Sequence, residues 1–126
     1  MEIKEELSTP YIKLDKEKCI LTLKGKSYPE HPDLFYDPIV DEIERCKENL
    51  TNTKITINMA LEILNSVSTK YIFHLVKSLY KSAMETEVKW YYEKDDESML
   101  EEGNYLKSLL PGSNFKLISV EDLRAI

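Results

Sequence analysis

The sequence predicts an α/β protein with a mixed β-sheet, and two observations lead to this prediction. Stretches with the two-residue period of strands come in turn with amphipathic stretches that have the period of helices. Their order is a β-hairpin, then α-β-α-β-α-β, which is typical of helices packed on a sheet whose later strands are parallel. No repeat or linker interrupts the chain, so we expect one domain over 1–126 with its core at about 8–120.

The hairpin is predicted over residues 11–25, in the stretch YIKLDKEKCILTLKG. Ile12 and Leu14 alternate with polar neighbours before the charged DKEK turn, and Leu21 and Leu23 alternate after it. The next stretch, SYPEHP, contains two prolines and is therefore predicted to be irregular.

Three helices follow in the prediction. The first begins at Pro38, because proline suits a first helical turn, and its apolar residues recur at three- and four-residue steps to Leu50. The third covers residues 95–110, begins with acidic residues as the helix dipole favours, and ends before Pro111. The second is the best defined, and its apolar face consists of Ile72, Phe73, Val76, Leu79, Tyr80 and Ala83.

Three further strands separate and follow these helices. In ITINMALEI, residues 55–63, apolar and polar side chains alternate too regularly for a helix. TEVKWYYE, residues 86–93, is rich in aromatic residues, as strands often are, and must place at least one ring on each face of the sheet. FKLISV, residues 115–120, is the last predicted strand.

Composition and charge argue against several classes of protein. The net charge is −6 and the basic residues are scattered, which argues against binding to nucleic acid or to anionic lipid. No apolar run approaches the ~20 residues of a membrane span, and the charged N-terminus lacks a signal core. We therefore expect a cytoplasmic protein with no membrane contact, in which Cys19 and Cys46 are reduced thiols.

Motifs for catalysis or cofactor binding are absent. Three glycines are too few and too far apart for a phosphate-binding loop, and the acidic run EKDDE (93–97) lacks the glycine of a calcium-binding EF-hand. Cys19, Cys46, His31 and His74 do not have the spacing of a zinc site. We expect no cofactor, no metal and no small-molecule substrate, although a small enzyme using the acidic run with a histidine remains an alternative.

Hydroxyl side chains are crowded at the turn before the second helix. Asn65, Ser66, Ser68 and Thr69 lie within five positions, whereas one residue, Asn65 or Ser66, is enough to cap the helix. A phosphate on Ser66 would meet the unpaired amides of a helix start and add about −2 charges. The turn suits a phosphorylation switch, but plain capping with spare hydroxyls accounts for the same residues.

Five stretches between Ser8 and Gly103 resemble the SiaC family of bacterial regulatory phosphoproteins, a domain similar in fold to the STAS anti-sigma-factor antagonists. The stretches are STPYIKLD, LKGKSYPE, FYDPI, ITIN followed by LNSVSTK, and VKWYYEKDDESMLEEG. The resemblance implies a non-enzymatic switch protein that is phosphorylated on Ser66, directly after Asn65, with Ser68 as the second candidate.

The same resemblance implies partners. A dedicated kinase and a PP2C-type phosphatase would set the state of Ser66, and the unmodified form would bind and activate a diguanylate cyclase, which raises cyclic di-GMP. The expected partner-binding residues are Asn65, Ser66, Ser68, Thr69, Lys70, Ser27, Tyr28, Pro29 and Glu30. A partner-switching protein of the anti-sigma-factor-antagonist type and a plain structural adaptor, in which Ser66 is only a cap, are the alternatives.

Overall fold

A computed structural model describes all 126 residues and contains a six-stranded sheet with the strands in chain order. The strands are β1 (Glu2–Ile3), β2 (Tyr11–Asp15), β3 (Ile20–Ser27), β4 (Lys54–Leu64), β5 (Glu85–Glu93) and β6 (Asn114–Val120). The helices are α1 (Pro32–Cys46), α2 (Ser66–Ser82) and α3 (Glu97–Ser108), with short 3-10 helices at Lys47–Leu50 and Leu123–Ala125.

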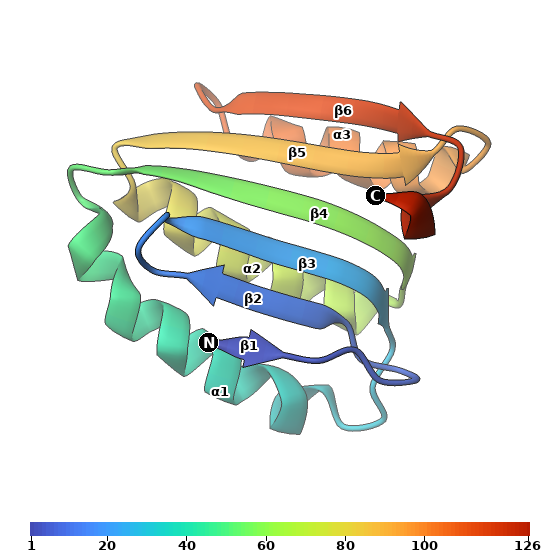
Figure 1. Ribbon diagram of the computed structural model, residues 1–126, viewed down its shortest axis with the longest axis horizontal. Coiled ribbons are helices and arrows are strands. Elements are labelled where there is room, and N and C mark those ends of the chain that lie inside the picture. The colour runs from blue at the N-terminus through green and yellow to red at the C-terminus, as the bar shows by residue number, and fades with distance from the viewer.

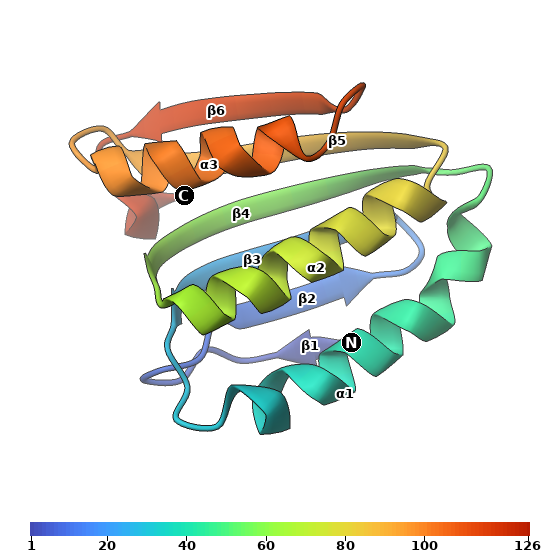
Figure 2. The same ribbon diagram turned by 180° about the vertical axis from the view of Figure 1, so that it is seen from behind.

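The sheet is mixed, as predicted. The strands β1, β2 and β3 pair antiparallel, and β3, β4, β5 and β6 pair parallel. All three α-helices lie on one face of the sheet, and the opposite face carries only the C-terminal 3-10 helix (Figures 1 and 2). Because parallel strands end at the same edge, the connections that lead into the helices gather at that edge.

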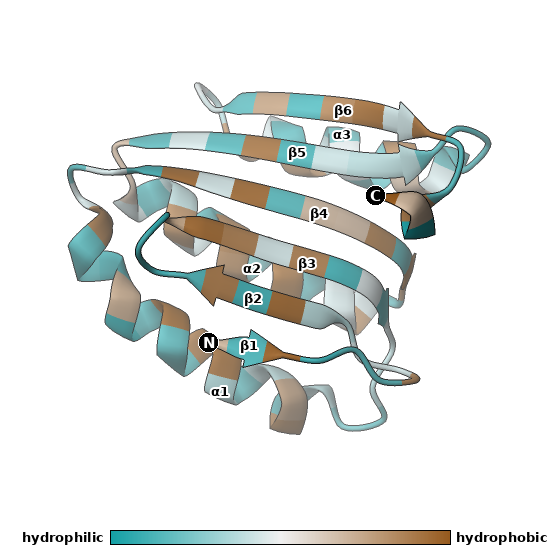
Figure 3. Ribbon diagram, in the orientation of Figure 1, coloured by the Kyte–Doolittle hydropathy of each residue, from teal (hydrophilic) through white to brown (hydrophobic).

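The core fills the space between the sheet and the helices. Apolar and polar residues alternate along β2, β3 and β4 (Figure 3), and the apolar ones face the helices. Ile72, Phe73, Val76 and Leu79 of α2 are buried as predicted, whereas Tyr80 and Ala83 are only partly buried at the margin of the core.

The first helix begins at Pro32, so the prediction that it begins at Pro38 is wrong. Pro32 takes the first turn, where no amide donor is needed, and Pro38 lies inside the helix on its exposed side. Proline has no amide proton, so Pro38 cannot donate the helical hydrogen bond to the carbonyl of Leu34. Leu34 is an exposed residue, so a water molecule can donate to that carbonyl instead. The strand β1 and the C-terminal 3-10 helix were not predicted.

The close contact between α3 and the sheet depends on a glycine. A Cβ atom added at Gly103 would lie 2.6 Å from the Trp90 ring and 2.7 Å from a methyl group of Leu117. The Trp90 indole is fixed by its hydrogen bond to the carbonyl of Met99 at 3.0 Å, so it cannot move aside freely.

We therefore expect Gly103→Ala to lower the free energy of unfolding by about 1 kcal/mol or more, because overpacking outweighs the better helix propensity of alanine. Urea unfolding followed by circular dichroism measures this change. Asn104→Ala is the matched control on the exposed side of the same helix and should not destabilise the protein. Equal stability of the Gly103→Ala protein and the wild type would contradict this close packing.

Candidate functional site at the start of α2

The hydroxyl-rich turn lies at the edge where β3 and β4 end and where α1 and α2 begin. The parallel pairing of the two strands continues to their last residues, with Ser27 opposite Leu64. The amide of Asn65 then donates to the carbonyl of Ser27 at 3.2 Å, and α2 begins at the next residue, Ser66. The turn and the loop after Ser27 are thus neighbours, as a shared partner surface requires.

Asn65, and not Ser66, caps α2. Its side-chain oxygen accepts a hydrogen bond from the amide of Ser68 at 2.9 Å, and the hydroxyl of Thr69 donates to its carbonyl at 3.0 Å. Ser66 is the first residue of the helix, is exposed, and its hydroxyl forms no hydrogen bond within the protein. Its hydroxyl is therefore not needed for capping and is accessible to a modifying enzyme.

Ser68 points in the opposite direction, into the core. Ser68 and Ser27 are both 0% exposed, and the hydroxyl of Ser27 donates to that of Ser68 at 2.8 Å. The Tyr36 hydroxyl lies 2.5 Å from Ser27 Oγ and must be the donor there, because the one proton of Ser27 already points to Ser68. We call Tyr36, Ser27 and Ser68 the hydroxyl chain; it joins α1, β3 and α2.

The expectation that Ser27 and Ser68 lie on a partner surface is therefore wrong. Both hydroxyls are occupied in the buried hydroxyl chain, and Pro29 is also buried. Asn65, Lys70, Tyr28 and Glu30 are exposed as expected, and Thr69 is half-buried. A kinase could reach the Ser68 hydroxyl only if the first turn of α2 opened, because no part of that residue is exposed to solvent.

Aromatic packing supports the hydroxyl chain. The ring of Tyr36 stacks on that of Tyr71 with centroids 4.9 Å apart and an interplanar angle of 11°, and Phe35 packs edge-on at 4.8 Å. Burial raises the pKa of Tyr36 above its usual value, which keeps the hydroxyl protonated and able to donate. The starts of α1 and α2 are thus held together beneath the exposed turn.

Exposed apolar side chains occur on the segments that meet at this edge of the sheet. These segments are the β1–β2 loop, the connection from β3 into α1, the first turn of α1, the end of β4 and the start of α2 (Figure 1). We call these side chains the apolar rim, and they are Leu7, Tyr28, Leu34, Ile63 and Val67. Beside Val67, a shallow hollow of about 380 Å³ between α1 and α2 is lined by Lys70, Tyr71 and His74 among others.

Of the apolar rim, only Tyr28 was predicted from the sequence, because the exposure of an apolar side chain at a strand or helix end depends on tertiary packing. The burial of Ser68, however, had a detectable signal. Ser68 precedes Ile72 by four residues, so it continues the buried face of α2 by one turn. Ser66 falls outside that face.

The residues considered for catalysis or metal binding do not come together. His31 is the residue before α1 and His74 lies on α2, and both are exposed. Asp96 caps α3 by accepting from the amide of Met99 at 3.1 Å. Glu93 accepts from the amide of Leu123, also at 3.1 Å. No group of three or more histidine, cysteine or acidic side chains is placed to hold a metal ion, and none of the helices could span a membrane.

Comparisons with known proteins agree with the fold described above. A family model described as "SiaC family regulatory phosphoprotein" matches residues 3–120. The crystal structure of the diguanylate cyclase SiaD in complex with its activator SiaC, from Pseudomonas aeruginosa, contains a similar chain with a TM-score of 0.77 and 20% identity, covering 94% of this chain and 97% of that chain. Apo-SiaC from Pseudomonas aeruginosa has a TM-score of 0.73 and 22% identity, covering 94% and 96%. No curated protein matches.

Proposed function

Since the chain belongs to the SiaC family of regulatory phosphoproteins, we propose that it is a non-enzymatic switch whose phosphorylation on Ser66 controls the binding of a partner protein. The observation that carries this proposal is the position of Ser66. The residue is exposed, its hydroxyl has no hydrogen bond within the protein, and it lies at the edge of the sheet whose segments carry the apolar rim. Modification can therefore change the surface without disturbing the core.

The proposed mechanism is electrostatic. A phosphate at the first residue of α2 is held by the unpaired amides of the helix start and by the positive end of its dipole. Lys70 lies one turn further along and is exposed, so it can pair with the phosphate inside the same molecule. A partner that buries the apolar rim would have to desolvate about two negative charges, and the complex is weakened.

We propose a diguanylate cyclase as the partner, bound and activated by the unmodified form. The support is the likeness in fold to SiaC, which is described as the activator of the diguanylate cyclase SiaD in a solved complex. A kinase and a PP2C-type phosphatase, both in the cytoplasm, complete the proposed switch. A partner-switching role with another target would use the same exposed surface around Ser66.

Mass analysis of the protein isolated from its native host tests the modification. We expect one phosphate on the peptide that contains Ser66 in part of the population, and none after treatment with a phosphatase. Fragment masses distinguish Ser66 from Ser68, because Val67 separates them. Phosphate on Ser68 alone would show that Ser66 is not the acceptor. No phosphate under any growth condition would contradict the proposal and favour the structural adaptor.

A further inference from the structure

Cations on the open face of the sheet fall into two groups. Three of them have carboxylate partners: two lysines lie 3.8 Å and 3.4 Å from one glutamate, and one arginine lies 2.7 Å and 2.5 Å from two other glutamates. The pairs are Lys54 and Lys116 with Glu87, and Arg124 with Glu5 and Glu62. In the middle of the face, Lys24 and Lys89 form neither an ion pair nor a side-chain hydrogen bond, so their positive charges are not balanced by a direct partner.

The strand register brings these two lysines to one place. Residues paired across neighbouring parallel strands point to the same face, so two adjacent rows of side chains stand on the open face. One row is Thr22, Asn58 and Lys89, and the other is Lys24, Ala60 and Tyr91. Because Ala60 is small, a gap remains between the longer side chains of Lys24 and Tyr91.

That gap is part of a hollow of about 260 Å³. Its polar lining consists of Lys24, Lys89, Thr22 and Asn58, and no carboxylate side chain takes part. Its apolar lining consists of Tyr91, Ala60, Met59 and Ile126, and the terminal carboxylate of Ile126 forms no ion pair with either lysine. The wall therefore offers two ammonium groups, a hydroxyl and an amide beside an aromatic ring.

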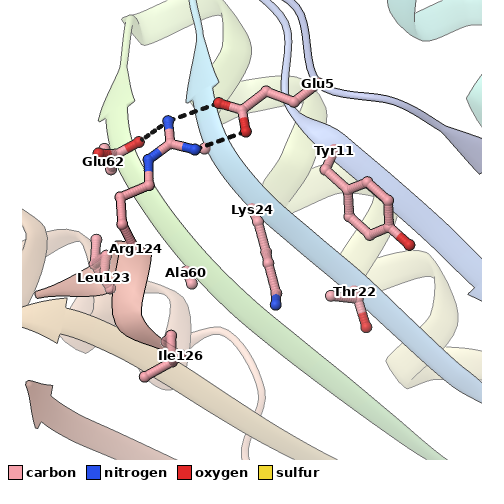
Figure 4. A pocket seen from close by; sticks show the side chains of 10 residues that line it. Glu5, Tyr11, Thr22, Lys24, Ala60, Glu62, Leu123, Arg124 and Ile126 are labelled. Carbon is pink, nitrogen blue, oxygen red and sulfur yellow. Dashed lines mark hydrogen bonds and ion pairs between the residues drawn. The ribbon is translucent and has the colours of Figure 1, made fainter.

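A larger hollow of about 430 Å³ adjoins the first and shares the side chains of Lys24 and Thr22 with it. Glu5 and Glu62 line this larger hollow, and both pair with Arg124 at its far end, which balances one of their two negative charges (Figure 4). Lys24 extends away from that ion cluster (Figure 4). Glu87, on the same strand as Lys89, is paired with Lys54 and Lys116.

We propose that the hollow between Lys24 and Lys89 binds a small molecule that carries phosphate groups. Two ammonium groups on one side, with hydroxyl and amide donors between them, match the charge and the acceptor oxygens of a diphosphate. The Tyr91 ring and Ala60 provide an apolar wall for the body of the ligand, as in nucleoside phosphates. This site is on the face opposite the helices, so it does not depend on the phosphorylation of Ser66.

Titration of the folded chain with three probes, followed by its amide NMR signals, tests the site. We expect inorganic pyrophosphate and adenosine diphosphate to shift the signals of Thr22, Lys24, Asn58 and Lys89 in a saturable way, and adenosine to shift none of them. Lys24→Gln and Lys89→Gln should each weaken binding about tenfold. The matched control is Lys77→Gln, which removes an exposed, unpaired lysine from α2 and should leave binding unchanged.

These exposed or half-buried substitutions should change stability by no more than about 0.5 kcal/mol, so a loss of binding would not reflect unfolding. Three results would overturn the proposal. They are the absence of saturable shifts at millimolar concentrations of both phosphate probes, binding by adenosine as tight as by adenosine diphosphate, and unchanged binding in the protein with both lysines replaced.

Discussion

Replacing Ser66 with aspartate is expected to weaken binding of the diguanylate cyclase that we propose as the partner about a hundredfold, whereas Ser66→Ala should bind as tightly as the wild type. Aspartate adds a charge at the edge of the sheet whose segments carry the apolar rim, and a partner that covers this surface must remove water from that charge without supplying a counter-ion. Alanine removes only a hydroxyl that forms no hydrogen bond in the free protein. Titration calorimetry with the purified cyclase measures both affinities, and cyclase activity should change in parallel.

Measuring the free energy of unfolding of Ser66→Asp shows whether a loss of partner binding comes from the added charge or from a destabilised helix. Aspartate in the first turn is favoured by the helix dipole, so Ser66→Asp should be as stable as the wild type or slightly more so. Asn52→Asp is the matched control, because it adds the same charge at an exposed loop before β4, at the opposite edge of the sheet. Equal affinity of the Ser66→Asp and wild-type proteins, or an equal loss in the Asn52→Asp protein, would contradict a switch at this turn.

Tyr36→Ala is expected to lower the free energy of unfolding by about 3–5 kcal/mol, as for other large buried aromatic side chains. The ring is 0% exposed and stacks on Tyr71, so its removal leaves a cavity where α1 and α2 meet. Tyr36→Phe keeps the ring but leaves Ser27 without its donor, and should cost about 1 kcal/mol. Urea unfolding monitored by circular dichroism measures both changes.

Tyr105 provides the comparison for this prediction. It is 59% exposed on α3, and Tyr105→Ala should change stability by no more than about 0.5 kcal/mol. If Tyr36→Phe were as destabilising as Tyr36→Ala, the hydroxyl chain and not ring packing would provide most of the stability at this position. If neither variant lost stability, the buried placement of Tyr36 would be contradicted.

The elements that could be predicted from the sequence are those with a clear local period. The strand β4 and the helix α2 each bury one regular face, so alternation and the three-to-four repeat were sufficient to locate them. The start of α1 was misplaced because two prolines, Pro32 and Pro38, could each occupy a first turn, and the packing of Tyr36 beneath α2 decides between them. The strand β1 is two residues long and exists only through pairing with β2.

The sequence was sufficient to predict that the candidate site lies at the turn before α2, but not which side chains of that turn are exposed. Asn65 followed by serines indicated a capped helix start, and the helical period of Ile72 could have separated the buried Ser68 from the exposed Ser66. The hydrogen bond between Ser27 and Tyr36 could not be predicted, because it depends on how α1 packs on the sheet and no local sequence pattern indicates that packing. Similarly, Lys24 and Lys89 are far apart in the chain and become neighbours only through the strand order and register.

At the start of α2, helix capping and core packing are carried out by different residues. Asn65 caps the helix, Ser68 belongs to the core, and the side chain of Ser66 takes part in neither. If Ser66 is the acceptor, as we propose, phosphate can be added and removed over many cycles without any refolding of the protein between them. We expect the two forms to have the same resistance to proteolysis and the same lifetime, so that the signal is stored only in the fraction of molecules that carry phosphate.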